Sequence, residues 1–286
     1  MKNYDVIIIG AGPAGMTAAI YLQRSNLKIA LIERNAPGGR MLQASDITNY
    51  PGIIGSGADI AQSMFSMLDF SKIEFILDDV LSIQKPNDKF IVKTKTMELE
   101  ADKVVLATGF INRPIENTNE KDFIGKGISY CALCDAPLVK DKTIVCLGNG
   151  IKAIEEINYL ATLAKKVYLL TKAENLELKP NIEILKDAKI THFNGTFKLN
   201  SVDVLYNNET ITIDCDFAFL FNGYIPGTNL VKDLDILNKQ NLIEVDDHLE
   251  TKVKGLYAIG DVNIKDVKQV ATAVGDGAYV ASKLLR

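Results

Sequence analysis

Short apolar runs and helical segments alternate in two parts of this chain. Residues 6–9, Val-Ile-Ile-Ile, predict a buried strand, an alanine-rich stretch ending near Ser25 predicts a helix, and residues 28–32 predict a second strand. The same order of strand, helix and strand returns at residues 143–147, 155–164 and 167–170. Strand–helix–strand units build parallel sheets with helices on their faces. The pattern therefore predicts an α/β fold with a repeated module.

A glycine-rich turn joins the first strand to its helix. Gly10, Gly12 and Gly15 form a G-x-G-x-x-G pattern, in which the glycines allow a tight turn, a close approach to a pyrophosphate and close helix packing. The helix N-terminus then supplies backbone N–H groups to the phosphates. Glu33 ends the second strand, where an acid accepts hydrogen bonds from ribose hydroxyls. We predict a dinucleotide site here, with a glycine-rich packing turn as the alternative.

The second module has a weaker form of this site. Its turn, residues 148–153, reads Gly-Asn-Gly-Ile-Lys-Ala, and its second strand is followed by one lysine, Lys172, and two acids, Glu174 and Glu177. The 2′-phosphate of NADP favours arginines at this place, and NAD favours an acid at the strand end, where Thr171 stands. The pattern indicates a Rossmann-like domain that keeps its fold and has lost its nucleotide.

Two cysteines and an acid form the chemical motif of the chain. Cys131 and Cys134 are separated by two residues, and Asp135 follows them. Such a pair suits dithiol–disulfide exchange, although half of a zinc site looks the same. No second C-x-x-C is present, and Cys146 and Cys215 lie in apolar surroundings that indicate packing. We predict a redox pair and no metal.

Composition limits the classes of partner. The chain has 286 residues, of which 47% are hydrophobic and 24% charged, with a net charge of −4. That balance predicts a globular protein with no nucleic-acid partner. No apolar run approaches the roughly 20 residues that a membrane helix needs. The first strand begins near the N-terminus without a signal-peptide pattern, so we expect a cytoplasmic protein, in a reducing compartment where a cysteine pair is more often catalytic than structural.

Several motifs recur in an order known from one family. They occupy residues 10–15, 49–52, 107–109, 131–135, 260–261, 269–273 and 275–277. This order resembles that of the low-molecular-weight thioredoxin reductases. The resemblance implies two Rossmann-like, three-layer ββα nucleotide-binding domains, the second inserted into the first. Residues 1–111 and 240–286 would form a discontinuous FAD-binding domain, residues 112–239 an inserted pyridine-nucleotide-type domain with the C-x-x-C, and the protein a homodimer.

The resemblance also implies roles for individual residues. Cys134 would face the flavin, Cys131 would exchange with the substrate disulfide, and Asp135 would move a proton. The residues expected to bind FAD are Gly10, Gly12, Pro13, Ala14, Gly15, Glu33, Gly39, Arg40, Asn49, Thr108, Gly109, Asp261, Lys268, Gln269, Val270 and Ala271. Ala136 stands where the family usually has glycine, a change that leaves the chemistry intact.

The NADPH site departs from the family pattern in three places. Lys152 stands where NADPH-dependent members carry Ser or Thr, and residues 171–173 replace a His-Arg-Arg cluster. An arginine-bearing helix is missing between Glu177 and Asn181. These departures resemble the ferredoxin-dependent flavin thioredoxin reductases of anaerobic bacteria, which do not use NADPH.

We therefore predict an FAD-dependent enzyme that reduces thioredoxin or a thioredoxin-like protein with electrons from ferredoxin or flavodoxin, without binding NADPH. A plant-type ferredoxin near −400 mV can reduce a thioredoxin disulfide near −270 mV, a step of ~130 mV or roughly 6 kcal/mol downhill. The first alternative is a thioredoxin reductase that uses NADPH or NADH, with Lys172 as its only phosphate contact. The others are a small-molecule dithiol oxidase and a flavoprotein sensor without turnover.

Overall fold

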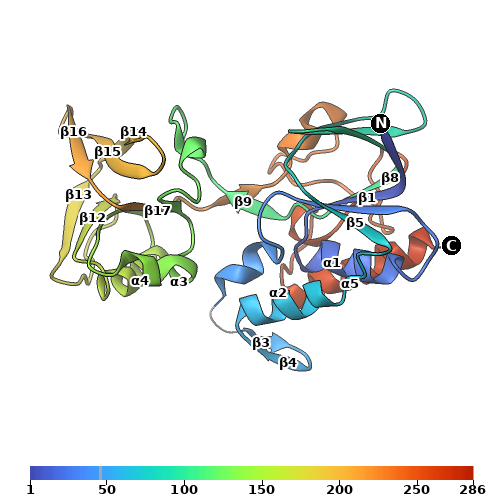
Figure 1. The fold of residues 1–286 in the computed structure, drawn as a ribbon, viewed down its shortest axis with the longest axis horizontal. Helices are drawn as coiled ribbons and strands as arrows, with labels where there is room; N and C mark the ends of the chain where they lie inside the picture. Colours follow the sequence, from blue (N-terminus) through green and yellow to red (C-terminus); the bar gives the residue numbers. More distant parts are fainter. Residues whose placement is uncertain (45–46, 286) are drawn as a thin grey trace. The chain divides into compact units, whose positions relative to one another are not determined.

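The chain folds into two compact units in the computed structural model, which describes residues 1–44 and 47–285 (Figure 1). The first unit is made of Met1–Ile111 and Ile225–Arg286, and the second of Asn112–Tyr224. The second unit is thus inserted into the first. The chain leaves through β9 (Phe110–Asn112) and returns through β18 (Tyr224–Pro226), and these two strands pair with each other.

The first unit is built on a seven-stranded sheet. Its order is β5-β2-β1-β8-β7-β6, with β19 also paired to β8. The strands are β1 (Lys2–Ile9), β2 (Ile29–Glu33), β5 (Ile73–Leu77), β6 (Val80–Gln84), β7 (Phe90–Thr94), β8 (Glu98–Leu106) and β19 (Leu256–Ala258). The strands β5, β2, β1, β8 and β19 run parallel to one another, whereas β7 is antiparallel to β8 and β6 is antiparallel to β7. The first half of β8 pairs with β7 and its second half with β19.

Helices cover one face of this sheet (Figure 1). They are α1 (Pro13–Leu22), α2 (Gly57–Ser66) and α5 (Val270–Leu284). Smaller elements complete the unit: η1 (Gly39–Gln43), the hairpin β3 (Ile47–Tyr50) and β4 (Ile53–Gly55), η4 (Asn229–Leu234) and η5 (Gly260–Val262). The helix α2 begins after Ser56, whose side chain accepts a hydrogen bond from the backbone N–H of Asp59.

The second unit repeats the plan of the first. Its parallel sheet has the order β10-β17-β11-β12-β13, made of β10 (Ile128–Ser129), β17 (Phe217–Phe221), β11 (Thr143–Gly148), β12 (Lys166–Thr171) and β13 (Ile182–Lys186). An antiparallel sheet holds β14 (Lys189–Gly195), β15 (Leu199–Tyr206) and β16 (Glu209–Asp214). The helical segments are η2 (Glu120–Asp122), α3 (Ala132–Asp135), η3 (Ala136–Val139) and α4 (Ile151–Ala161).

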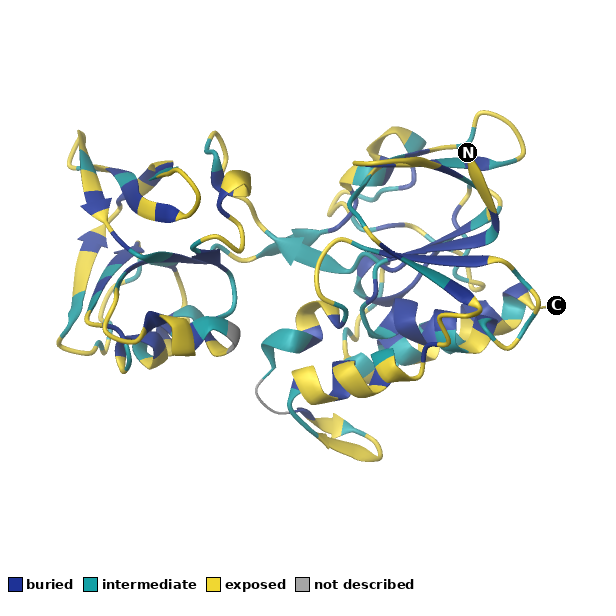
Figure 2. Cartoon of the chain, in the orientation of Figure 1, coloured by how far each residue is buried: buried dark blue, intermediate teal, exposed yellow. Residues whose placement is uncertain are grey.

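Each unit has a hydrophobic core of its own. In the first unit, one cluster lies between the sheet and the helices and a second contains Tyr4, Phe90 and Val231. The second unit has two separate clusters, around Phe193 and Phe219. Figure 2 shows the buried residues concentrated in the strands and on the inner faces of the helices. Separate cores explain how one Rossmann-like domain can be inserted into another. The predicted fold class is confirmed.

Two sequence-based boundaries are corrected. The second domain boundary was expected at residue 240 and lies between Tyr224 and Ile225, because Val231 and Ile236 are buried in the core of the first unit. Helix α4 begins at Ile151 rather than at residue 155, directly after the glycine turn. None of the described helices is both long and apolar enough to cross a membrane.

Candidate functional site

The glycine turn of the first unit lies between β1 and α1. Gly10 has a φ of +104°, and a Cβ there would lie 2.4 Å from the backbone oxygen of Ala107. A Cβ on Gly15 would lie 1.9 Å from the backbone oxygen of Gly10. Both positions need glycine so that the strands and the helix can approach. Gly12 differs, since nothing lies within 4 Å of the place its Cβ would take. The turn leaves open space there, before the helix that Pro13 begins.

Glu33 is held at the end of β2, over this turn. One carboxylate oxygen accepts the backbone N–H of Ala11 at 2.7 Å, and the other accepts the N–H of Asn35 at 3.0 Å. Each oxygen keeps a lone pair for a further donor. The structure therefore places the predicted acid beside the predicted glycine turn.

The residues expected around a flavin come from distant parts of the first unit. The Asn49 side chain donates to Gln269 Oε1 at 3.1 Å, which connects β3 to the start of α5. Gln269 caps that helix, and Val270 and Ala271 form its first turn. Ala14 is also near, because a Cβ on Gly260 would lie 3.0 Å from the Ala14 side chain. The N-termini of α1 and α5 therefore lie close together in the first unit.

Thr108, Phe110 and two cations form the other part of this region. The Thr108 Oγ1 is buried and has no hydrogen-bond partner among the described residues. Gly109 follows it, with a φ of +55°. The Phe110 ring centroid lies 5.9 Å from the Arg40 guanidinium carbon and 5.2 Å from Lys268 Nζ. Burial lowers the pKa of Lys268.

The backbone beside Asp261 is held by a partly buried ion pair that the sequence did not reveal. Asp276 accepts the backbone N–H of Gly260 at 2.8 Å and also pairs with Lys265, and both paired side chains are only 16% exposed. Lys268 Nζ donates to the backbone oxygen of Asp261 at 2.5 Å. These contacts hold the backbone of η5, which carries Asp261. The G-D-G motif around Asp276 was the only signal of this pair in the sequence.

The first unit fits a flavin adenine dinucleotide. An unsatisfied buried hydroxyl is costly unless a ligand pairs with it, and Thr108 supplies one. Gly12 leaves space at a helix N-terminus, and Glu33 lies at the adjacent strand end. The predicted FAD residues, from Gly10 to Ala271, all lie in this unit, including Gly39 at the start of η1.

The second unit carries the cysteine motif. Cys131 is disulfide-bonded and half-buried, and its backbone N–H donates to Ser129 Oγ at 3.1 Å. Its backbone oxygen accepts the N–H of Asp135 at 3.3 Å, which closes the single turn α3. Asp135 is half-buried at the end of this turn. Cys134 lies within α3, and its side chain is outside the described part of the structure.

The other two cysteines pack in the core of the second unit. Cys146 and Cys215 are free and buried. Burial raises the pKa of Cys215 to about 12, with the nearby Asp216 and Asp214 adding to it. Burial also raises the pKa of Cys146, and the nearby Cys215 adds to it. Neither thiol is therefore a nucleophile near neutral pH. Within the described part of the chain, no cluster of His, Cys, Asp and Glu could hold a metal ion.

The glycine turn of the second unit is connected to its strand end in a different way. Asn149 Oδ1 accepts the Thr171 hydroxyl at 3.1 Å and the backbone N–H of Lys172 at 2.7 Å. In the first unit the strand end supplies the acceptor, Glu33, whereas here the turn supplies it. Glu174 pairs with Lys186. This strand end thus has no carboxylate in the place of Glu33.

Comparisons with known proteins agree with this arrangement. The profile of the pyridine nucleotide-disulphide oxidoreductase family matches residues 4–277. This chain belongs to that family. Within it, the chain is 37% identical over 294 residues to the thioredoxin reductase of Ureaplasma parvum, covering 97% of this chain and 94% of the relative. The resemblance to thioredoxin reductases predicted from the motifs is therefore confirmed.

Solved structures of this family share the fold. The thioredoxin reductase of Lactococcus lactis, in its FR conformation, has a TM-score of 0.71 and 33% identity, covering 99% of this chain and 98% of that one. A ferredoxin-flavin thioredoxin reductase from Clostridium acetobutylicum has a TM-score of 0.58 and 30% identity, covering 100% and 98%. The chain is thus a flavin-type oxidoreductase of the thioredoxin reductase group.

Proposed function

We propose that this protein reduces the disulfide of thioredoxin, or of a thioredoxin-like protein, through Cys131 and Cys134. The observation that carries the proposal is the disulfide-bonded Cys131 in a C-x-x-C motif followed by Asp135. The match to thioredoxin reductases over nearly the whole chain supports it. Cys146 and Cys215 are free and buried, so the proposal assigns Cys134 as the partner of Cys131.

The proposed exchange starts from the dithiol. The Cys131 thiolate attacks one sulfur of the substrate disulfide, which forms a mixed disulfide and releases one substrate thiolate. Cys134 then attacks the Cys131 sulfur, which releases the second substrate thiolate and restores the Cys131–Cys134 disulfide. Two electrons pass to the substrate, and the two protons lost by the cysteines end on its thiols. We assign Asp135 as the group that holds and returns a proton.

We propose that the first unit holds FAD. Gly12 and the N-terminus of α1 would bind the pyrophosphate, and Glu33 would accept hydrogen bonds from the ribose. Thr108 would donate its unpartnered hydroxyl, and Asn49 and Lys268 would lie on the flavin side. FAD supplies, when bound, the two electrons that return the disulfide to the dithiol, and it accepts electrons singly or in pairs.

The comparisons favour a pyridine nucleotide as the electron donor, since the matched family is named for one. The glycine turn of the second unit indicates which pyridine nucleotide would bind. Both acceptor positions of Asn149 Oδ1 are taken by Thr171 and Lys172, so the strand end presents the Asn149 NH₂ group and the Lys172 ammonium. Donors suit a phosphate better than a ribose diol. We therefore expect NADPH to bind more tightly than NADH, with Lys172 as the phosphate contact.

Ferredoxin is the second candidate donor, favoured by the composition of the second unit. Arg113 is the only arginine in residues 112–224, and the unit has none at the end of β12, where a 2′-phosphate favours one. The likeness to a ferredoxin-flavin thioredoxin reductase supports this candidate. A homodimer and a cytoplasmic location stay predictions.

An anaerobic titration separates the two donors. The FAD-loaded protein is mixed with NADPH, NADH or reduced ferredoxin, each with a thioredoxin disulfide, and flavin absorbance and new thiols are followed. Bleaching by NADPH that weakens in Lys172→Ala supports the nucleotide, with Lys179→Ala as the control. Bleaching by ferredoxin alone supports the second candidate. Absence of thioredoxin thiols with every donor contradicts the proposed function.

A further inference from the structure

Glu120 is a buried carboxylate without a part in the proposed exchange. Its side chain lies in η2 and is 3% exposed. One carboxylate oxygen accepts the backbone N–H of Ile115 at 2.6 Å, and the other accepts the hydroxyl of Tyr130. Among the described residues, no cation forms an ion pair with it. Burying a carboxylate costs free energy, so its hydrogen bonds indicate a positional role.

Tyr130 connects this carboxylate to the redox motif. It directly precedes Cys131 and packs against the core of the second unit. The residue before it, Ser129, belongs to β10 and accepts the backbone N–H of Cys131. The position of Cys131 is therefore set by two neighbours, Ser129 through the sheet and Tyr130 through Glu120.

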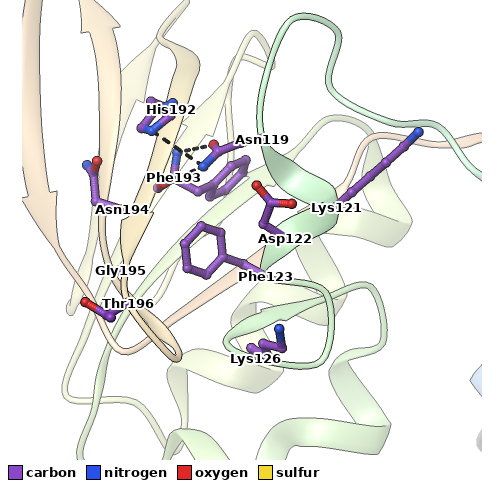
Figure 3. Close-up of a pocket in the computed structure, with 10 residues that line it drawn as sticks. All are labelled: Asn119, Lys121, Asp122, Phe123, Lys126, His192, Phe193, Asn194, Gly195 and Thr196. Atoms are coloured by element: carbon purple, nitrogen blue, oxygen red, sulfur yellow. Dashed lines mark hydrogen bonds between the residues drawn. The ribbon is translucent and has the colours of Figure 1, made fainter.

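The segment that carries Glu120 is itself fixed to the antiparallel sheet. Asn119 Oδ1 accepts the backbone N–H of Phe193 at 2.9 Å, and Asn119 Nδ2 donates to the Phe193 oxygen at 2.9 Å. Figure 3 shows these bonds at the edge of β14, beside an open groove lined by Lys121 and Asp122. The backbone that carries Glu120 is thus held in place by Asn119, and the buried Glu120 side chain is directed toward Ile115 and Tyr130.

We propose that Glu120, acting through Tyr130, is a positioning residue that holds Cys131 in the geometry of its disulfide. A C-x-x-C pair forms a disulfide easily when its two sulfurs are held at the required separation. Releasing Tyr130 lets the first cysteine move, which lowers the effective concentration of one thiol at the other. The dithiol is then favoured, so the protein becomes a weaker reductant of thioredoxin. This inference rests on the proposed pairing of Cys131 with Cys134.

The test is the equilibrium between the protein disulfide and glutathione, which needs neither electron donor nor substrate. FAD-loaded wild type, Glu120→Gln, Tyr130→Phe and the double variant are equilibrated in glutathione buffers, and the dithiol fraction is measured by alkylation and mass. We expect each single variant to shift the equilibrium constant roughly three- to tenfold toward the dithiol. That shift raises the reduction potential of the disulfide by about 14 to 30 mV for a two-electron couple.

Two further results decide the proposal. Because both residues act through one hydrogen bond, the double variant should shift the equilibrium no more than either single variant. Asp122→Asn, an exposed acid in the same η2, is the matched control and should leave it unchanged. Equal potentials in wild type and Tyr130→Phe, or additive shifts in the double variant, would overturn the proposal. Tyr130→Phe removes one hydroxyl, so the test stands even where Glu120→Gln fails to fold. If wild type shows no disulfide at these two cysteines, the proposed function fails instead.

Discussion

Asn49 and Gln269 lie 220 residues apart, and the Asn49 side chain donates to Gln269 Oε1 at 3.1 Å. The bond connects the β3–β4 hairpin to the cap of α5. Since the inserted unit lies between these two positions in the chain, the proposed flavin site is complete only after the chain has returned to the first unit. Cofactor binding should therefore depend on both segments of that unit.

Thr108→Val should affect the FAD-free and the FAD-loaded protein in opposite directions. The buried Thr108 Oγ1 has no partner in the described structure, and removing an unsatisfied buried hydroxyl stabilises a protein by about 1 kcal/mol. The variant should therefore unfold at a higher temperature without FAD. It should bind FAD roughly fivefold more weakly, because the hydroxyl no longer pairs with the cofactor. Thermal unfolding and flavin fluorescence measure the two effects.

The control for this prediction is Thr94→Val. The Thr94 hydroxyl donates to the Met97 oxygen at 3.0 Å and accepts the Met97 N–H at 3.0 Å. Its loss should lower stability with and without FAD. If Thr108→Val behaves like Thr94→Val and keeps its affinity for FAD, Thr108 does not contact the cofactor.

Alanine at two glycines of the same turn should have different effects. At Gly15 the new Cβ would lie 1.9 Å from the Gly10 oxygen, so we expect Gly15→Ala to lose the folded first unit. At Gly12 nothing lies within 4 Å, so Gly12→Ala should fold with near wild-type stability and bind FAD at least about tenfold more weakly. Circular dichroism and flavin retention on gel filtration separate these outcomes.

Gly275→Ala provides a control for the added methyl group. Nothing lies within 4 Å of its Cβ position, and the residue lies in α5. The variant should retain FAD. Full flavin retention by Gly12→Ala would contradict the proposed pyrophosphate position.

The two proposed redox cysteines should behave differently when each is replaced by serine. Cys134→Ser leaves Cys131 able to attack thioredoxin, but the mixed disulfide then has no second thiol to resolve it. We expect a stable covalent complex on non-reducing gels. Cys131→Ser should give no complex. A complex formed through Cys134 alone would reverse the proposed roles.

In the reduced protein, only Cys131 and Cys134 should react with an alkylating reagent between pH 7 and 9. The pKa of Cys215 is raised to about 12, and burial also raises that of Cys146. The thiolate is the reactive form, so a raised pKa keeps both thiols protonated through pH 7 to 9. In reduced, folded protein, alkylation followed by peptide mass spectrometry should find label on Cys131 and Cys134 alone. Rapid labelling of Cys146 at pH 8 would contradict its burial.

Local patterns predicted the parts of the fold that depend on neighbouring residues. The glycine turn at Gly10, the strands on either side of α1 and the cysteine motif are continuous in sequence, so their types and order could be inferred. The start of α4 was missed because Ile151, its first residue, is apolar and 82% exposed and gives no amphipathic signal.

Contacts between distant residues could not be predicted. The domain boundary was misplaced because burial of Val231 and Ile236 depends on strands more than a hundred positions earlier. The pairs Glu120–Tyr130 and Lys265–Asp276 depend on side chains meeting in three dimensions. A single sequence carries no periodic signal for such pairs.

A single-turnover reaction tests the central claim without assuming an electron donor. FAD-loaded protein is reduced by two electrons only, freed of reductant, and mixed with thioredoxin disulfide under nitrogen, and the thiols formed on thioredoxin are counted. We predict that two thiols appear for each protein molecule, as the protein disulfide re-forms, and that Cys131→Ser produces none. If reduced wild type leaves the thioredoxin disulfide intact, the protein is not a thioredoxin reductase.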